Sequence, residues 1–215
     1  MAYLQSLLKW HIISLGKPII LTGAMNTPEE DEGEGAGNLL FAMNMLKDHK
    51  NQGIVALALN HKLIRSAGKK FDATDRSPFI GSGTSALEEM RKERDRKATV
   101  IRFLEMKKHR LEFITLQPLL AIPLDAPLED GLLLAVYGQG TVLEDPELRQ
   151  RVRRYKEAGR PVVVVSQVPY NELDPAQYEA GGWLLEEGLI LGAGSFLEEG
   201  VGCLSYLINK APEDF

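Results

Sequence analysis

The chain has 215 residues, of which 44% are hydrophobic and 26% are charged, and its formal net charge is −5. This length and composition are typical of a globular protein with one large or two small domains, whose core needs neither a disulfide nor a metal ion. The negative charge argues against a nucleic-acid-binding protein. Cys203 is the single cysteine, which excludes an internal disulfide and indicates a cytoplasmic setting. The longest apolar runs have the length of strands, too short to cross a membrane.

The first sixty residues alternate helical and strand patterns. Apolar side chains recur at helical spacing over residues 1–14, and the short apolar run at 19–22 predicts a covered strand. A polar, acidic and glycine-rich loop follows at 26–37, before helical spacing returns at 38–50. The apolar run at 53–59 predicts a second buried strand. This order predicts a parallel sheet flanked by helices, with ligand sites at the carboxyl ends of the strands.

Residues 82–111 differ in composition, because charges of alternating sign are concentrated at 88–97. Such a segment is typical of a solvated helix or a linker. The α/β pattern resumes after it. Strands are predicted at 132–137, 160–165 and 189–191, and helices at 146–159, 178–187 and 197–209. Asp145 is the predicted cap of the first of these helices and Gly159 its predicted stop.

We therefore predict an α/β fold in which a parallel-sheet N-terminal domain is followed by a smaller α/β C-terminal domain. The predicted N-terminal domain covers residues 1–80 and the C-terminal domain 113–215. A charged linker is predicted between them at 81–112.

Several segments together carry a resemblance to a known family. They include LGKPIILTGAM at residues 15–25, GEGAGNLLFAM at 33–43 and GKKFDATDRSPF at 68–79. In the second half they include LLLAVYGQGTV and the long stretch that begins RPVVVVSQVPY. In this order and spacing, the segments resemble the bacterial-type L-asparaginase family, and within it the cytoplasmic type I branch.

The resemblance implies a two-domain α/β enzyme, typically a dimer of dimers, that hydrolyses the side-chain amide of asparagine, and sometimes of glutamine, without a cofactor. In that family two threonines and a lysine carry out the reaction. Lys70 corresponds to the lysine, and Lys69 beside it is predicted to point away. Thr22 and Ala24 are the candidate substrate-binding residues at the end of the first strand. A lysine amine can accept a proton from a hydroxyl where burial or a neighbouring charge lowers its pKa.

The string Met1-Ala2-Tyr3 resembles the sequence that follows the second threonine motif in the type I branch. We therefore expect this chain to be truncated and to lack both catalytic threonines.

Gly33, Glu34 and Gly35 stand where the family usually has a serine-aspartate-glycine triplet. Residues 125–131 are too few for the helix that the family carries there. The C-terminal domain is therefore expected to lack one strand-helix unit or to use residues 116–122 as a short strand.

Two interpretations remain open at this point. The chain is either an incomplete amidohydrolase, inactive alone and completed by an N-terminal asparaginase subunit, or a non-catalytic asparaginase-like binding or scaffold protein that associates with a partner chain. A homo-oligomer and a small amino-acid ligand are compatible with both, whereas a membrane or a nucleic acid is not expected as a partner. A third candidate, the asparaginase-like subunit of a transfer-RNA-dependent amidotransferase, is disfavoured by the acidic charge balance.

Other candidate residues favour structural roles. Ser166 follows a predicted strand but lacks the turn of a nucleophile elbow and a histidine partner. His61 is predicted to be a surface residue and Cys203 a buried core thiol. The acidic run at 29–34 lacks the alternation of oxygen ligands in calcium loops, so we predict no metal site there.

Overall fold

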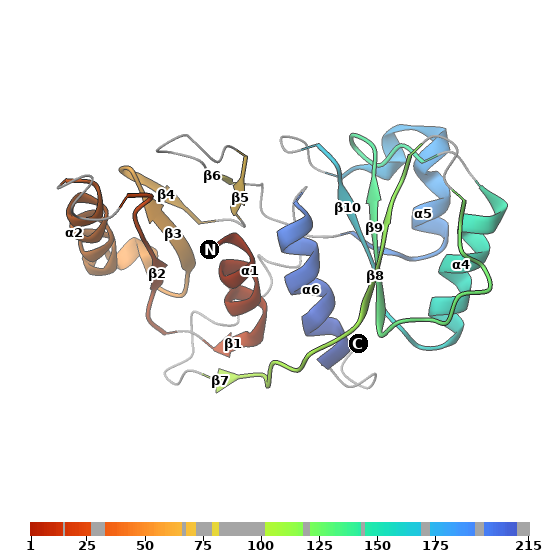
Figure 1. Ribbon diagram of the computed structural model, residues 1–215, viewed down its shortest axis with the longest axis horizontal. Helices are drawn as coiled ribbons and strands as arrows, with labels where there is room; N and C mark the ends of the chain where they lie inside the picture. Colours follow the sequence, from red (N-terminus) through yellow and green to blue (C-terminus); the bar gives the residue numbers. More distant parts are fainter. Residues whose placement is uncertain are drawn as a thin grey trace.

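The molecule consists of two α/β units, and a pair of packed helices lies between their sheets (Figure 1). A computed structural model describes residues 1–14, 16–26, 33–65, 68–71, 79–81, 102–117, 121–142, 145–168, 173–191 and 196–209. The charged segment at 88–97 and most of the acidic run at 29–34 lie outside the described residues. Among the described helices, none is long and apolar enough to cross a membrane. The predicted α/β fold class is confirmed.

The first unit is built on a small sheet of strand order β2–β3–β4. Strands β2 (Ile19–Leu21) and β3 (Val55–Leu59) are parallel, and β4 (Lys62–Ile64) is antiparallel to β3. Every side chain of β3 is buried, as predicted for a strand covered on both faces. The prediction of a covered first strand is wrong: β2 is only half-buried, because no described strand pairs with its other side.

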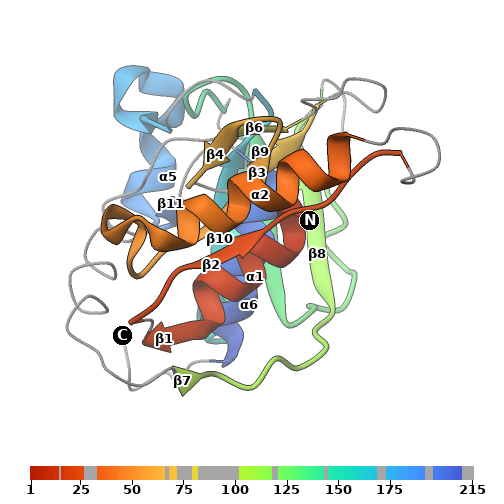
Figure 2. The same ribbon diagram turned by 90° about the vertical axis from the view of Figure 1, so that its left-hand side faces the viewer.

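Helices α1 (Ala2–His11) and α2 (Glu34–Lys47) lie on opposite faces of this sheet (Figures 1 and 2). Helix α1 ends three residues before the predicted end, because β1 (Ile12–Ser14) leaves it and pairs with β7 (Arg102–Phe103). Helix α2 begins at Glu34, four residues earlier than predicted. Three glycines near its start disfavour a helix locally, and packing against the sheet outweighs that preference.

Two hairpins complete the first unit. Asn60 and His61 join β3 to β4 as a two-residue turn with φ angles of +44° and +55°. His61 is exposed, as predicted, and its ring lies edge-on to that of Phe41 with centroids 5.6 Å apart. Strands β5 (Gly68–Lys70) and β6 (Phe79–Gly81) form the second hairpin, and β5 lies against α1 and α6.

The second unit is built on a four-stranded parallel sheet of order β11–β10–β9–β8. Its strands are β8 (Leu111–Thr115), β9 (Gly131–Val136), β10 (Val162–Ser166) and β11 (Ile190–Leu191). Strands β9 and β10 are central and buried throughout, and they lie within two residues of the strands predicted at 132–137 and 160–165.

Helix α6 (Leu197–Asn209) covers one face of this sheet, and α4 (Pro146–Glu157) and α5 (Gly182–Glu186) cover the other (Figure 1). The predicted bounds of α6 are confirmed. So is the cap of α4, because Asp145 Oδ1 accepts hydrogen bonds from two backbone N–H groups in its first turn. Gly159 follows α4 with a φ of +65°, as a helix stop requires. Helix α5 is shorter than predicted, since its glycine pair disfavours an earlier start.

The connection from β8 to β9 contains no helix in its described residues. The alternative in which residues 116–122 form a strand is wrong for the four of them that are described. The strand is instead Leu111–Thr115, directly before them. The described part of this parallel crossover is therefore irregular, and side chains from α4 hold it.

Helices α1 and α6 pack against each other and join the two units. Glu199 of α6 is fully buried and accepts hydrogen bonds from Ser6 Oγ at 3.2 Å, Lys9 Nζ at 3.0 Å and Trp10 Nε1 at 2.8 Å. A Cβ added to Gly202 would lie 2.1 Å from Ser6 Oγ, so only glycine permits this close approach. A buried charge and tight packing thus fix how the units sit together.

Candidate functional site

Thr22 and Ala24 lie where predicted, directly after β2 at its carboxyl end. Thr22 Oγ1 donates a hydrogen bond of 2.7 Å to the carbonyl oxygen of Ala58, which fastens the end of β2 to β3. Ala24 is exposed, and its side chain lies beside the first turn of α2 at Gly35. The Thr22 hydroxyl is therefore engaged in a hydrogen bond within the sheet, whereas Ala24 lies at the surface.

Asn38, on the buried side of α2, links the ends of both parallel strands. Its Nδ2 donates to the carbonyl oxygen of Gly23 at 2.8 Å, and its Oδ1 accepts from the Asn60 N–H at 2.7 Å. The sequence pattern did not identify Asn38 as a residue of this site. The available signal is a polar residue four positions before Ala42, on the same apolar face of a helix that follows a strand.

Glu34 fastens the loop after β2 to the start of α2. Both of its carboxylate oxygens accept from the Met25 N–H at 3.2 Å, and one accepts from the Asn26 N–H at 3.3 Å. A negative charge at the amino end of a helix is also favoured by the helix dipole. Glu34 therefore orders the backbone around Ala24.

Lys70 is the last residue of β5, paired with Phe79 across the hairpin, and it is exposed. Side chains alternate along a strand, so Lys70 belongs to the same face of β5 as Gly68. That face is turned toward α1 and β3, since a Cβ on Gly68 would meet Leu57 and Gln5. Lys69 points the other way, with its ammonium 5.9 Å from the centroid of the Phe196 ring.

Gln5 positions the strand that carries Lys70. It is fully buried; its Nε2 donates to the carbonyl oxygens of Val55 at 3.2 Å and Ile64 at 3.0 Å, and its Oε1 accepts from the Gly68 N–H at 3.0 Å. One amide thus ties α1 to three strands. The sequence gives a weak signal, a polar residue within the apolar spacing of a helix.

The described residues do not bring a nucleophile to Lys70. Within them, no serine or threonine hydroxyl forms a hydrogen bond with the Lys70 amine, and no polar contact joins Lys70 to Thr22 or Ala24. Ser166 Oγ donates to the carbonyl oxygen of Gly138 at 2.5 Å and so serves the turn after β9. Cys203 is buried, as predicted. No group of three His, Cys, Asp or Glu side chains in the described part of the chain could hold a metal ion.

Residues 1–100 match the family model described as "Asparaginase, N-terminal". The predicted resemblance to the asparaginase family is confirmed. The structure of L-asparaginase I from Vibrio cholerae O1 biovar eltor str. N16961 is similar to all of this chain, covering 100% of it and 69% of the other, with a TM-score of 0.75 and 23% identity. The thermostable L-asparaginase from Thermococcus kodakarensis gives a TM-score of 0.73 at 21% identity, covering 99% of this chain and 68% of that one. No curated protein sequence matches the chain.

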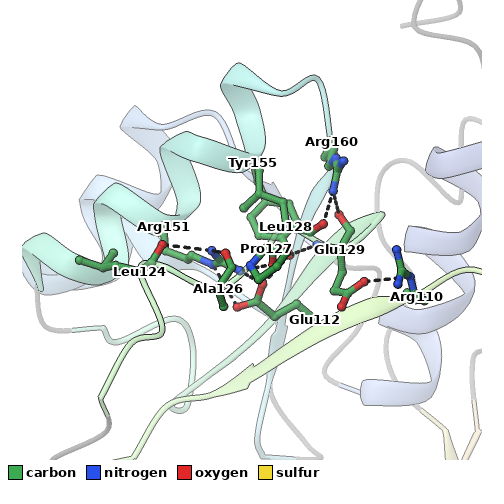
Figure 3. A network of polar contacts seen from close by, with 10 residues as sticks. All are labelled: Arg110, Glu112, Leu124, Ala126, Pro127, Leu128, Glu129, Arg151, Tyr155 and Arg160. Atoms are coloured by element: carbon green, nitrogen blue, oxygen red, sulfur yellow. Dashed lines mark hydrogen bonds and ion pairs between the residues drawn. The ribbon is translucent and has the colours of Figure 1, made fainter.

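In this asparaginase fold, a network of polar contacts joins β8, the segment before β9 and α4 in the second unit (Figure 3). Arg151 of α4 bonds the Glu112 carboxylate of β8 with two nitrogens, at 2.5 and 3.2 Å. It also donates to three carbonyl oxygens of the irregular crossover, those of Leu124, Ala126 and Pro127. Arg160 holds the next two carbonyl oxygens of the same segment.

Tyr155 completes this network. Its hydroxyl donates to Glu112 Oε2 at 2.5 Å and accepts from the Glu129 N–H at 2.9 Å. Burial and the hydrogen bond to Glu112 raise the pKa of Tyr155 to about 12. Because the network lies near the amino ends of the parallel strands, and ligands bind at the carboxyl ends, we assign it a structural role. It satisfies carbonyl groups that no helix or strand satisfies.

Proposed function

We propose that this chain is an asparaginase-family amidohydrolase in incomplete form, which takes part in hydrolysis of the asparagine side-chain amide to aspartate and ammonia. The observation that supports this most directly is the position of Lys70 on the α1-facing side of β5, in the segment that resembles the family's lysine motif. The match of residues 1–100 to the N-terminal asparaginase model supports it as well. We further propose a cytoplasmic location, in keeping with the single, buried Cys203.

In this proposal Lys70 is the base, and Thr22 and Ala24 contact the substrate at the end of β2. A hydroxyl from a second polypeptide attacks the amide carbon while its proton passes to the Lys70 amine. The amide nitrogen then accepts that proton from Lys70 and leaves as ammonia, so that an ester forms. Water then hydrolyses the resulting ester to release aspartate.

The second candidate is a non-catalytic asparaginase-like binding or scaffold protein that associates with a partner chain. Two observations favour it. The described hydroxyls of Thr22 and Ser166 are engaged in structural hydrogen bonds, and Glu34 bonds the backbone where the family's triplet usually stands. In this case the chain binds asparagine, aspartate or a protein partner without turnover.

Ammonia release from asparagine distinguishes the two candidates. We expect no turnover by the purified chain, and turnover after a separately expressed N-terminal segment of a type I asparaginase is added. In the mixture, Lys70→Met should lower the rate by at least about 100-fold, as for loss of a general base, whereas the matched control Lys69→Met should retain most of it.

Turnover by the chain alone would contradict the proposed incompleteness. An inactive mixture would contradict the amidohydrolase, and calorimetry with asparagine and aspartate would then test the binding protein.

A further inference from the structure

His11, the last residue of α1, is fully buried where α1 and α6 lie side by side (Figures 1 and 2). Its Nδ1 lies 3.0 Å from the carbonyl oxygen of Leu7, and a carbonyl only accepts, so Nδ1 carries a proton. Its Nε2 lies 3.1 Å from Asn209 Nδ2 and 3.3 Å from Ser205 Oγ, both on α6. An amide NH₂ group only donates, so Nε2 accepts. The ring that joins the two helices is therefore neutral.

Asn209 connects this buried ring to a second histidine. Its Oδ1 lies 3.1 Å from Nε2 of His109, a half-buried residue in the segment before β8. One amide group thus lies between two imidazole rings, with its oxygen toward His109 and its nitrogen toward His11. If the amide turned over, His109 Nε2 would have to accept a hydrogen bond, which a protonated ring cannot do.

Protonation of both rings conflicts with this arrangement. A protonated His109 donates from both ring nitrogens and keeps the Asn209 oxygen on its own side. A protonated His11 would then direct its new N–H at the NH₂ group of Asn209 and at the Ser205 hydroxyl, which would have to turn its own proton away. The charge would also lie in a fully buried position, where an ionised group is costly.

The acidic group of α6 that lies in this contact already balances another cation. Glu199 binds Lys9 Nζ at 3.0 Å and Trp10 Nε1 at 2.8 Å. On α6 the other titratable side chains are Glu198, Cys203 and Tyr206, of which the last packs on Trp10. The segment before β8 adds exposed charges, which are Glu105, Lys107, Lys108 and Arg110. In that segment positive charges are in excess, which disfavours a further positive charge on His11.

We propose that His11 makes the contact between α1 and α6 sensitive to pH, with His109 acting on it through Asn209. The neutral ring closes the contact, and acid loosens it. A histidine in an unfolded chain takes up a proton near about pH 6.5. Because the fold holds His11 neutral, the unfolded chain binds one proton more below that pH, and the stability of the fold decreases as the pH falls.

This sensitivity extends to the candidate site, because α1 also carries Gln5, whose Oε1 accepts from the Gly68 N–H of β5. A loosened α1 therefore releases the strand that carries Lys70. The inference itself concerns stability and does not depend on catalysis by Lys70.

Urea unfolding of the purified chain at pH 7.5 and at pH 5.5 tests the proposal. The side-chain oxygen of a glutamine can accept from Asn209 but takes up no proton in this range. Between the two pH values, the equilibrium constant for unfolding should therefore rise about 10-fold more in the unchanged chain than in His11→Gln. The matched control His49→Gln, at an exposed histidine, should keep the full increase. An equal increase in the unchanged chain and in His11→Gln would overturn the proposal.

Nitrogen NMR of the histidine rings tests the same point without a substitution at His11, and so stands even where His11→Gln does not fold. The His11 ring should keep the chemical shifts of a neutral ring with its proton on Nδ1 at both pH values. A protonated His11 in the folded chain at pH 5.5 would contradict the proposal.

The role of His109 has its own variant. His109→Ala leaves the Asn209 amide able to turn its oxygen toward His11, so the increase in the unfolding constant between pH 7.5 and pH 5.5 should become smaller than in the unchanged chain. An undiminished increase would show that the amide does not couple the two rings, and that part of the proposal would be wrong.

Discussion

Glu187 has only 8% of its side chain exposed and is surrounded by cations of α4. Arg149 Nε lies 2.7 Å and Arg153 Nη2 2.8 Å from Glu187 Oε1, and Lys156 Nζ lies 3.4 Å from Oε2. Burial raises the pKa of Glu187, but the hydrogen bonds from Arg153 and Arg149 outweigh burial and lower the pKa to about 2. This carboxylate fastens the end of α5 to α4.

Removing this charge should give a pH-dependent loss of stability. Because the pKa of Glu187 is lower in the folded chain than in the unfolded one, its contribution is present above about pH 4.5 and is lost as the pH falls toward about 2. Glu187→Gln should therefore lower Tm clearly near neutral pH and much less near pH 2. Glu157→Gln, an exposed change at the end of α4, should have little effect at either pH. Equal effects of Glu187→Gln at both pH values would contradict the assignment.

Once residues 68–70 are assigned to a strand, the alternation of side chains along it is enough to predict that Lys69 and Lys70 point to opposite faces. Gln5 and Asn38 could not be predicted as anchors. Their hydrogen-bond partners lie 50 or more and 15 or more positions away, respectively, and local sequence pattern does not report such contacts. Whether Lys70, Thr22 and Ala24 act on a substrate stays a prediction.

Among the elements, the crossover from β8 to β9 depends most on side chains. Arg151 has 1% of its side chain exposed, forms an ion pair with Glu112 and donates hydrogen bonds to three backbone carbonyl groups. An unpaired buried carboxylate and unsatisfied carbonyl groups are both costly.

Arg151→Met should lower the free energy of unfolding by about 3–5 kcal/mol, because it leaves the Glu112 carboxylate, only 13% exposed, without its ion-pair partner. Arg154 lies three residues further along α4, and its half-buried side chain forms no hydrogen bond or ion pair among the described residues. Arg154→Met should therefore change the free energy of unfolding by less than about 1 kcal/mol. Urea unfolding followed by circular dichroism measures both. A loss below about 1 kcal/mol for Arg151→Met would contradict the structural role of the network.

Elements with strong periodicity and clear end signals, such as α4 and α6, were predicted well. The start of α2 was not, because the helix continues through glycines that pattern and propensity assign to a loop. Strand β1 was missed because its partner, β7, lies about ninety residues further along the chain. The partial exposure of β2 could not be predicted from its apolar sequence, because hydrophobicity does not indicate how many strands pair with it.

In the molecule as a whole, the two units meet through α1 and α6. Gly202 faces Ser6 and Trp10, and an added Cβ would lie 2.1 Å from Ser6 Oγ and 2.8 Å from Trp10 Cδ1. The domain order was predicted from the sequence, but this contact was not, since helical periodicity gives the apolar face of a helix and not its partner. The domain boundaries at residues 80 and 112 stay a prediction.

Gly202→Ala should lower the free energy of unfolding by about 1–3 kcal/mol, because the methyl group has no room between the two helices. The matched control is Gly182→Ala in α5, where a Cβ meets nothing within 4 Å. This control should be neutral or slightly stabilising. Thermal unfolding measures both. A neutral Gly202→Ala variant would show that α1 and α6 are not in close contact in solution.

Helix α1 belongs to two cores at once, since one side packs on β3 and the other on α6. Loss of either sheet would strip one side of α1 and expose Trp10 or Gln5 to water. The packing of one unit therefore contributes to the stability of the other, and we expect the chain to unfold as a single cooperative body rather than as two independent halves.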